Sequence, residues 1–246
     1  MPPEMIEKML SLMQIQKEHL LGDESIIEVP GVVRNKFNSF ENVENINGVA
    51  IPAYFEYLNT GSCSIFAGES PAHVHPKMIL RAAVLNDAML SGFQSKQNQI
   101  TKYRWITRDI FQKCAHRLQQ LIFGEISLEN SSNENLIFEK KTFRNNLGRF
   151  NVTGSIDVVD QGTNTVYELK CTKCLQDTHA IQLILYTALL SSNFSPRKKG
   201  QRAKLPQQQQ SFPKMKLFNV LTNEIWILHP TNPNWNQQAL DIVSCI

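Results

Sequence analysis

Apolar residues recur at helical spacing in the first segment of the chain. From Glu4 to Leu21 they return every three or four positions, and Gly22 follows as a stop signal. This pattern predicts an amphipathic helix without a chemical role. Residues 25–70 instead mix short apolar runs with Asn, Gly and Pro, which indicates irregular structure or short strands rather than long helices.

Two later stretches repeat the helical pattern before the period changes. Pro76–Leu90 and Thr107–Phe123 each place apolar residues along one helix face. Beyond a polar loop at 129–135, alternating positions predict strands at Leu136–Phe143, Gly148–Val159 and Thr165–Cys171. The remaining expected elements are a helix at Asp177–Leu190, a hairpin of Lys216–Val220 with Glu224–Leu228, and a short helix at Gln237–Ile242. This order predicts an α/β fold in which a mixed β-sheet is flanked by helices, with an N-terminal helical extension.

Length and composition limit the number of domains. At about 100–200 residues per domain, the 246 residues form one large domain or one domain with an attached subdomain. We expect an N-terminal extension at 1–75, helical and then irregular, a main domain at 76–230 and a C-terminal tail at 231–246. The composition, with 42% hydrophobic residues, 11 Gly and 5 Cys in 246 residues, excludes a wholly disordered chain, a collagen and a disulfide-stapled miniprotein.

Charge and cysteine usage indicate the compartment. The formal net charge is only +3, and no window approaches the roughly 18 apolar residues of a membrane-spanning helix, so no membrane partner is expected. The five cysteines stand at irregular spacing, and the N-terminus lacks the layout of a secretory signal. These features predict an intracellular protein that is not secreted.

A hairpin with its loop at Gln161–Asn164 is the most informative predicted element. With this loop the residue numbers of facing partners sum to a constant, so Asp157 lies directly opposite Glu168. Lys170, two residues beyond Glu168, shares their face of the sheet. The same register pairs Asp160 with Thr165, Val159 with Val166, Val158 with Tyr167, Ile156 with Leu169, and Ser155 with Lys170.

Two facing carboxylates call for positive charge between them. Facing residues have Cβ atoms about 4.5–5.5 Å apart, and like charges at that distance destabilise a sheet. Lys170 supplies one positive charge, and a divalent cation would supply the rest. Hard oxygen ligands favour Mg²⁺ or Mn²⁺, which suits phosphodiester hydrolysis. The alternative is that Asp157 and Glu168 simply face solvent on an edge hairpin, screened by Lys170.

Three short motifs around this hairpin resemble those of a known nuclease superfamily. They are Gly154-Ser155-Ile156-Asp157 as G-x-x-D, Glu168-Leu169-Lys170 as E-x-K, and Gln182 to Tyr186 as Q-x-x-x-Y. In this order and spacing they resemble the RecB-like branch of the PD-(D/E)xK nucleases, which includes the nuclease modules of helicase–nuclease proteins. The resemblance covers about residues 136–228.

This resemblance implies a restriction-endonuclease-like core within 76–230 and a Mg²⁺- or Mn²⁺-dependent deoxyribonuclease acting in replication, recombination or repair. By resemblance, Asp157, Glu168 and the backbone carbonyl of Leu169 bind the metal, and Lys170 is the catalytic lysine. Gln182 and Tyr186 line the active site and the DNA. DNA is the implied partner, together with a helicase domain or subunit. The alternative is a catalytically inactive nucleic-acid-binding module of the same fold.

The branch usually adds a histidine from an upstream helix. His116 is the obvious candidate ligand, yet at 100° per residue it lies nearly opposite the apolar face of its predicted helix. Gln119 is the other residue that fits this position. Glu139, on the preceding strand, is either an accessory acid or part of a solvated strand face.

Two further features admit alternatives. Cys171 and Cys174, with His179 close behind, could begin a zinc site and a zinc-dependent interaction domain. We expect free thiols and no iron–sulfur cluster, since some members of the similar family hold such a cluster with three cysteines after the nuclease core, and here only Cys245 follows Cys174. The basic, Gln-rich insertion at 191–216 contains Arg197, Lys198 and Lys199, which fit a nuclear-import signal, a DNA-backbone contact or a solvated loop.

Overall fold

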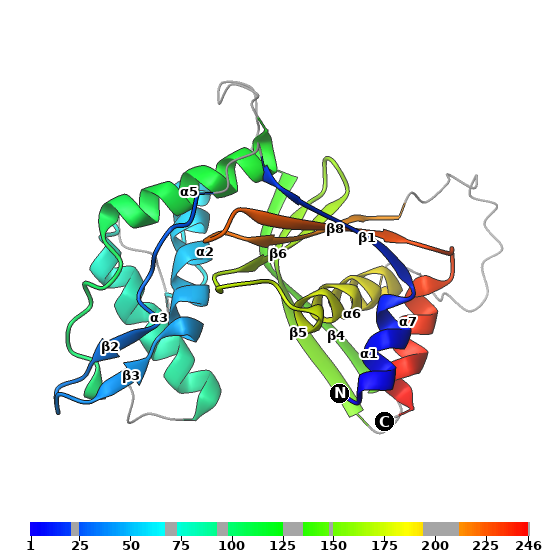
Figure 1. Ribbon diagram of the computed structural model, residues 1–246, viewed down its shortest axis with the longest axis horizontal. Helices are drawn as coiled ribbons and strands as arrows, with labels where there is room; N and C mark the ends of the chain where they lie inside the picture. The colour runs from blue at the N-terminus through cyan, green and yellow to red at the C-terminus, as the bar shows by residue number, and fades with distance from the viewer. Residues whose placement is uncertain are drawn as a thin grey trace.

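The centre of the fold is a six-stranded sheet in the order β1-β8-β7-β6-β5-β4 (Figure 1). The computed structural model describes residues 1–20, 25–66, 73–92, 98–124, 135–147, 150–193 and 212–245. The strands are β1 (Met13–His19), β4 (Leu136–Leu147), β5 (Phe150–Asp160), β6 (Thr165–Lys170), β7 (Lys214–Asn219) and β8 (Glu224–Pro230). Neighbours are antiparallel except β6 and β7, which are parallel. The predicted α/β fold with a mixed sheet is confirmed.

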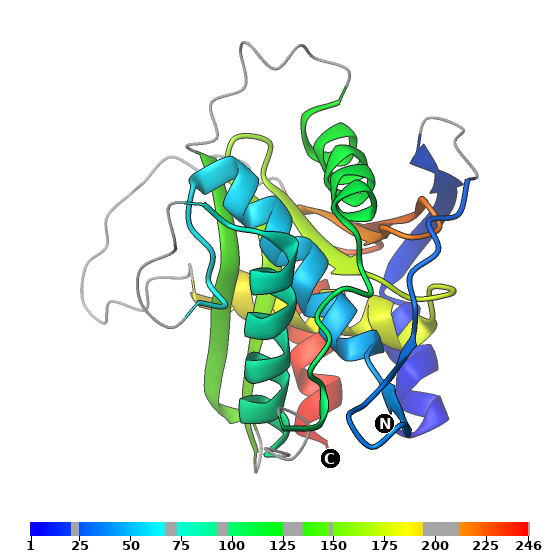
Figure 2. The same cartoon turned by 90° about the vertical axis from the view of Figure 1, so that its left-hand side faces the viewer.

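Helices cover both faces of this sheet (Figures 1 and 2). One face carries α1 (Pro3–Leu10), α6 (Asp177–Asn193) and α7 (Trp235–Ser244). The other carries α2 (Glu44–Thr60), α3 (Pro76–Ser91) and α5 (Arg108–Phe123). Successive residues of a strand alternate between the two cores, so Val166 packs with the first group and Tyr167 with the second.

The N-terminal segment departs from the predicted single helix. α1 ends at Leu10, and β1 then pairs antiparallel with β8 from Met13↔Pro230 to His19↔Glu224. The prediction of one helix over Glu4–Leu21 was wrong because the second half of this segment alternates with period two. As a paired strand it buries Met13 at the sheet. Lys17 covers the Trp226 ring with its Nζ 3.7 Å from the ring centroid.

The expectation of irregular structure at 25–70 is wrong for α2, a helix of 17 residues. Pro52 and Gly48 lie inside it, and both disfavour a helix in isolation. Eight buried residues of α2 outweigh that local cost by packing against α3, α5 and the sheet. The short strands β2 (Val32–Arg34) and β3 (Phe40–Asn42) form a separate hairpin before α2.

Both chain ends belong to the packed core. Met9, from the expected extension, and Trp235, from the expected tail, are fully buried in the cluster around α6. The remaining predicted helices and strands are present, with ends that move by a few residues. In the described ranges, no helix combines the length and apolar character needed to cross a membrane.

Candidate active site

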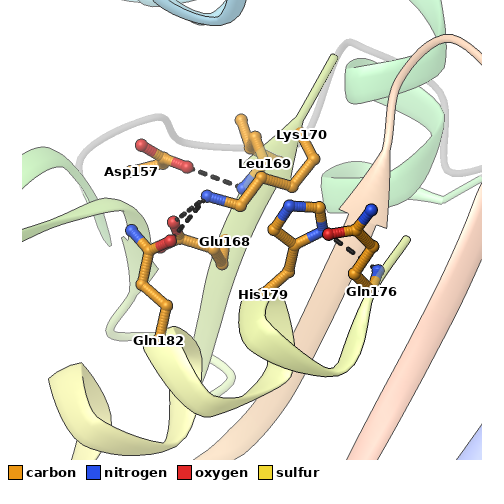
Figure 3. A network of polar contacts seen from close by, with 7 residues as sticks. All are labelled: Asp157, Glu168, Leu169, Lys170, Gln176, His179 and Gln182. Carbon is orange, nitrogen blue, oxygen red and sulfur yellow. Dashed lines mark hydrogen bonds and ion pairs between the residues drawn. The ribbon is translucent and has the colours of Figure 1, made fainter. Parts of the chain in front are cut away.

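The hairpin formed by β5 and β6 has the predicted register over its first three pairs. Asp160 faces Thr165, Val159 faces Val166 and Val158 faces Tyr167. The ladder ends there, one residue before the predicted pair of Asp157 with Glu168. Instead, the backbone N–H of Leu169 donates to Oδ2 of Asp157 at 2.6 Å (Figure 3). The two acids therefore flank the point where the strands part, rather than facing each other in a ladder.

Beyond this point the predicted pairing of the hairpin fails. Ile156 packs in the cluster around α6, whereas Leu169 packs on the opposite face of the sheet. Ser155 lies opposite Lys141 of β4 and not beside Lys170. The alternation of β5 changes face between Ile156 and Val158, which the strict two-residue period of the sequence pattern does not include.

Glu168 and Lys170 form the buried polar centre of the site (Figure 3). Glu168 is only 2% exposed, and Lys170 Nζ lies 2.7 Å from its Oε1. The same ammonium donates to Oε1 of Gln182 at 2.9 Å. The second carboxylate oxygen of Glu168, Oε2, is buried and has no hydrogen-bond partner among the described residues. A nearly buried carboxylate with an unpartnered oxygen is costly unless something else satisfies it.

Gly154 brings the third motif into contact with the other two. A Cβ added to Gly154 would overlap the ring of Tyr186, with the ring atom Cζ only 2.5 Å away. The absence of a side chain on β5 thus lets the Tyr186 side of α6 come down onto the sheet. Gln182, one turn earlier on α6, then reaches Lys170. The three motifs that are separate in sequence meet at one place.

The electrostatic environment of the site disfavours the simultaneous ionisation of both carboxyl groups. Burial, followed by the charge of Glu168, raises the pKa of Asp157 well above its usual range. Burial also raises the pKa of Glu168, although the Lys170 ammonium opposes that shift. One ammonium therefore does not compensate both acids, and a further proton or cation is needed to do so.

Glu139 and Glu56 extend the acidic surroundings of Asp157. Glu139, on the exposed side of β4 at φ 49°, accepts a hydrogen bond from Ser155 Oγ at 2.7 Å. Partial loss of solvent and the charge of Glu56 raise the pKa of Glu139. Glu56, on α2, is 9% exposed and is held by Ser64 through its N–H and Oγ. The sequence analysis did not select Glu56, although an acid within the apolar run of α2 was a usable signal.

The exposed position of His116 does not support its proposed role as a ligand. It lies on the exposed face of α5, because Cys114 and Leu118 supply the buried face. Gln119 is half-buried on the same helix. In the part of the chain that the structure describes, no group of three or more His, Cys, Asp or Glu side chains is placed to hold a metal.

His179 is a second residue near the site that the three sequence motifs did not indicate. Its Nδ1 accepts the backbone N–H of Gln176 at 3.1 Å, at the beginning of α6 (Figure 3). Burial and the nearby Lys170 ammonium lower the pKa of His179, which keeps the imidazole neutral at pH 7. Its position one turn before Gln182 on α6 was the available signal.

The cysteine pair is split between two environments. Cys171 is buried and Cys174 is exposed. Burial raises the pKa of Cys171 well above its usual range, which disfavours the thiolate that a zinc ligand requires. Arg197, Lys198 and Lys199 lie outside the described residues.

Comparisons with protein-family models, with curated proteins and with solved structures find no match to this chain.

Proposed function

We propose that this chain is a Mg²⁺- or Mn²⁺-dependent deoxyribonuclease that hydrolyses phosphodiester bonds on a restriction-endonuclease-like core. The observation that carries the proposal is the buried Glu168 carboxylate, which has one unpartnered oxygen and lies with Asp157 beside a single ammonium. By the resemblance of its motifs, the enzyme acts in replication, recombination or repair, alone or with a helicase.

The donor set fits a hard divalent cation. Asp157, Glu168 and the backbone carbonyl of Leu169 would hold the ion, with no histidine among them. Oxygen-only ligands in small number suit Mg²⁺ or Mn²⁺, which keep several waters and accept phosphate oxygens. When bound, the ion supplies Lewis acidity for a phosphoryl oxygen and lowers the pKa of a water molecule.

Lys170 is held ready to contact the scissile phosphate. Of the three N–H donors of its ammonium, one goes to Glu168 and one to Gln182, which leaves one for a phosphate oxygen. Because Glu168 and Gln182 fix the side chain in advance, little ordering is left to occur when charge develops on the phosphate. Gln182 and Tyr186 would line the DNA path beside it.

The second candidate function is nucleic-acid binding without cleavage. It is favoured by the hydrogen bond that Asp157 already accepts from Leu169 and by the exposed position of His116. Both functions predict DNA binding, so only cleavage separates them.

The test is cleavage of linear and circular DNA, single- and double-stranded, with Mg²⁺, Mn²⁺ or EDTA. Wild type is compared with Asp157→Ala and Lys170→Ala, and Lys173→Ala serves as the control for loss of an exposed lysine nearby. We expect metal-dependent cutting that falls by at least about a hundredfold in both site variants and is retained in the control. DNA binding without any cutting by wild type supports the non-catalytic module and overturns the nuclease.

A further inference from the structure

The hairpin of β2 and β3 exposes aromatic rings next to basic side chains. Phe37 and Phe40 are 67% and 66% exposed, although phenyl rings are normally buried in folded proteins. Lys36 Nζ lies 4.9 Å from the centroid of the Phe37 ring, and Arg34 Cζ lies 5.1 Å from that of Phe40. Exposed apolar groups gathered in so short a segment indicate an interaction surface.

The tip of this hairpin is fixed by its own hydrogen bonds. The Asn35 side-chain oxygen accepts the backbone N–H groups of Phe37 and Ser39, and the Asn35 amide donates to Glu41. Asn38 adopts the left-handed backbone conformation at φ 63° that the turn requires. The rings are therefore presented on an ordered support, which lowers the entropic cost of binding to them.

A basic pocket of about 430 Å³ lies between α3 and the segment 98–103. Lys77 and Arg81, one turn apart on α3, line it together with the polar side chains of Asn98, Thr101 and Tyr103. No acidic residue of the described chain lines this pocket, and neither Lys77 nor Arg81 has an ion-pair partner there. Two cations and several hydrogen-bonding groups in one concave site are the chemistry that recognises a phosphate.

The hairpin and the pocket adjoin each other. The backbone N–H of Lys36 donates to the carbonyl of Gln99 at 2.9 Å, and both neighbours of Gln99, Asn98 and Ile100, line the pocket. Both features lie at the end of the molecule that carries α3, far from α1 and α7 (Figure 1). The hairpin with the exposed rings thus adjoins the segment that lines the basic pocket.

We propose that the hairpin tip and this pocket form one binding surface for an unpaired nucleic-acid strand, with bases on Phe37 and Phe40 and a backbone phosphate between Lys77 and Arg81. The choice of ligand rests on the proposed function. Bases in a duplex are stacked on one another and hide their faces, whereas those of a single strand are free to stack on exposed rings. The basic side chains around the rings match the charge of the strand's backbone.

Binding is measured by fluorescence anisotropy in EDTA, so that cleavage plays no part. The probe is a labelled oligothymidylate of about 16 nucleotides, with a blunt duplex of equal length as the comparison. We expect wild type to prefer the single strand. Phe37→Ala with Phe40→Ala should weaken its binding by about tenfold or more, and Tyr at both positions should restore it, because the rings carry the stacking.

The matched control for the aromatic variant is Met89→Ala with Leu90→Ala. These residues are 81% and 79% exposed at the end of α3, so this variant removes similar apolar surface outside the hairpin tip. We expect its affinity to equal that of wild type. Equal affinity in the Phe37 and Phe40 variant would overturn the proposal, as would a change in its oligomeric state without a change in DNA binding, since the hairpin would then be a protein interface.

The positive charge of the pocket is tested separately, through the salt dependence of binding. Lys77→Ser with Arg81→Ser should lower the slope of log affinity against log salt by about 0.7, the value for one phosphate contact on a single strand. The aromatic variant should leave that slope unchanged. Lys8→Ser with Lys17→Ser removes the same charge from α1 and β1, outside the pocket, and should change the slope less. Equal slopes in the two charge variants would overturn the pocket's role.

These measurements are independent of the cleavage assay. A protein that prefers the single strand but never cuts DNA refutes the proposed nuclease and keeps this surface. A protein that cuts in a metal-dependent manner, but binds unpaired DNA equally with and without Phe37 and Phe40, keeps the nuclease and refutes this surface.

Discussion

Replacing Asp157 by Asn tests whether the site holds its two carboxylates together at a cost to stability. The asparagine side-chain oxygen can still accept the Leu169 N–H, so the variant removes the charge beside Glu168 and little else. Because the folded protein raises the pKa of Asp157, it binds a proton more tightly than the unfolded chain does. The contribution of Asp157 to stability is therefore fullest at low pH and is lost as pH rises from about 3.9, the unfolded value, through the raised folded pKa.

The size of the effect follows from the environment of the charge. A buried polar group left unsatisfied costs about 1–3 kcal/mol, and an uncompensated charge costs at least this much. We therefore expect Asp157→Asn to be more stable than wild type by this amount at pH 8 without divalent cations. In a chain of this size each kcal/mol moves the melting temperature by about 2–4 °C. The gain should vanish near pH 4, where wild-type Asp157 is protonated in the folded state.

The assay is urea and thermal unfolding in EDTA across this pH range, with Asp160→Asn as the matched control. Asp160 stands on the same strand but accepts hydrogen bonds from the N–H of Gly162 at 2.8 Å and from the Thr163 hydroxyl. Its neutralisation should destabilise the protein by about 1–2 kcal/mol, because charge-assisted bonds weaken. An Asp157→Asn variant that is less stable than wild type at pH 8 would refute the reasoning.

Divalent cations should reverse the order of the two proteins. A ligand that binds only the folded state at one hundred times its dissociation constant stabilises it by about 2.7 kcal/mol. We expect Mn²⁺ to raise the melting temperature of wild type, more strongly at pH 8 than at pH 5, because binding requires ionised carboxylates. Asp157→Asn should lose most of this gain. Equal stabilisation of both proteins would place the cation elsewhere.

Three further predictions concern the packing and burial of individual side chains. Gly154→Ala should destabilise the fold by about 1–3 kcal/mol in urea unfolding, because the added methyl group overlaps Tyr186. The loss of stability should be smaller in a Tyr186→Ala background, and additive losses from the two substitutions would contradict the contact. Arg117→Met should cost about 3 kcal/mol or more, since the buried guanidinium serves three backbone carbonyls, and a loss below about 1 kcal/mol would contradict that role. In native protein a thiol reagent should label Cys174 and Cys245 quickly and the buried thiols only after unfolding, so fast labelling of all five would contradict their burial.

The hairpin register was predictable because local chemistry determines it. The polar turn at 161–164 fixes which residues of β5 and β6 face each other, and Asn164 takes the left-handed conformation at φ 53° that such a turn favours. Beyond that turn, the alternation of Val158 and Val159 determines which residues face each of the two cores on either side of the sheet. The placement of Glu168 and Lys170 on one face followed from the same argument.

Other features depend on contacts distant in sequence. Residues 13–19 become a strand because β8, more than two hundred residues later, offers a partner, and their short local alternation does not identify that partner. α2 forms despite Pro52 because its apolar residues are buried between α3, α5 and the sheet. Within the site, the hydrogen bond from Leu169 to Asp157 ends the ladder early, which a rule for regular pairing does not include.

The connection between β6 and β7 explains why the three sequence motifs lie where they do. Two parallel neighbours require a crossover, and here α6 makes it directly after β6. The beginning of α6 therefore returns across the end of the strand that carries Glu168 and Lys170, and Gln182 is brought to the ammonium. Gly154 leaves room for Tyr186 at the next turn, so the neighbouring strand of the hairpin is drawn against the same helix. The spacing from E-x-K to Q-x-x-x-Y is thus a consequence of strand direction, and a longer loop before α6 would separate Gln182 from Lys170.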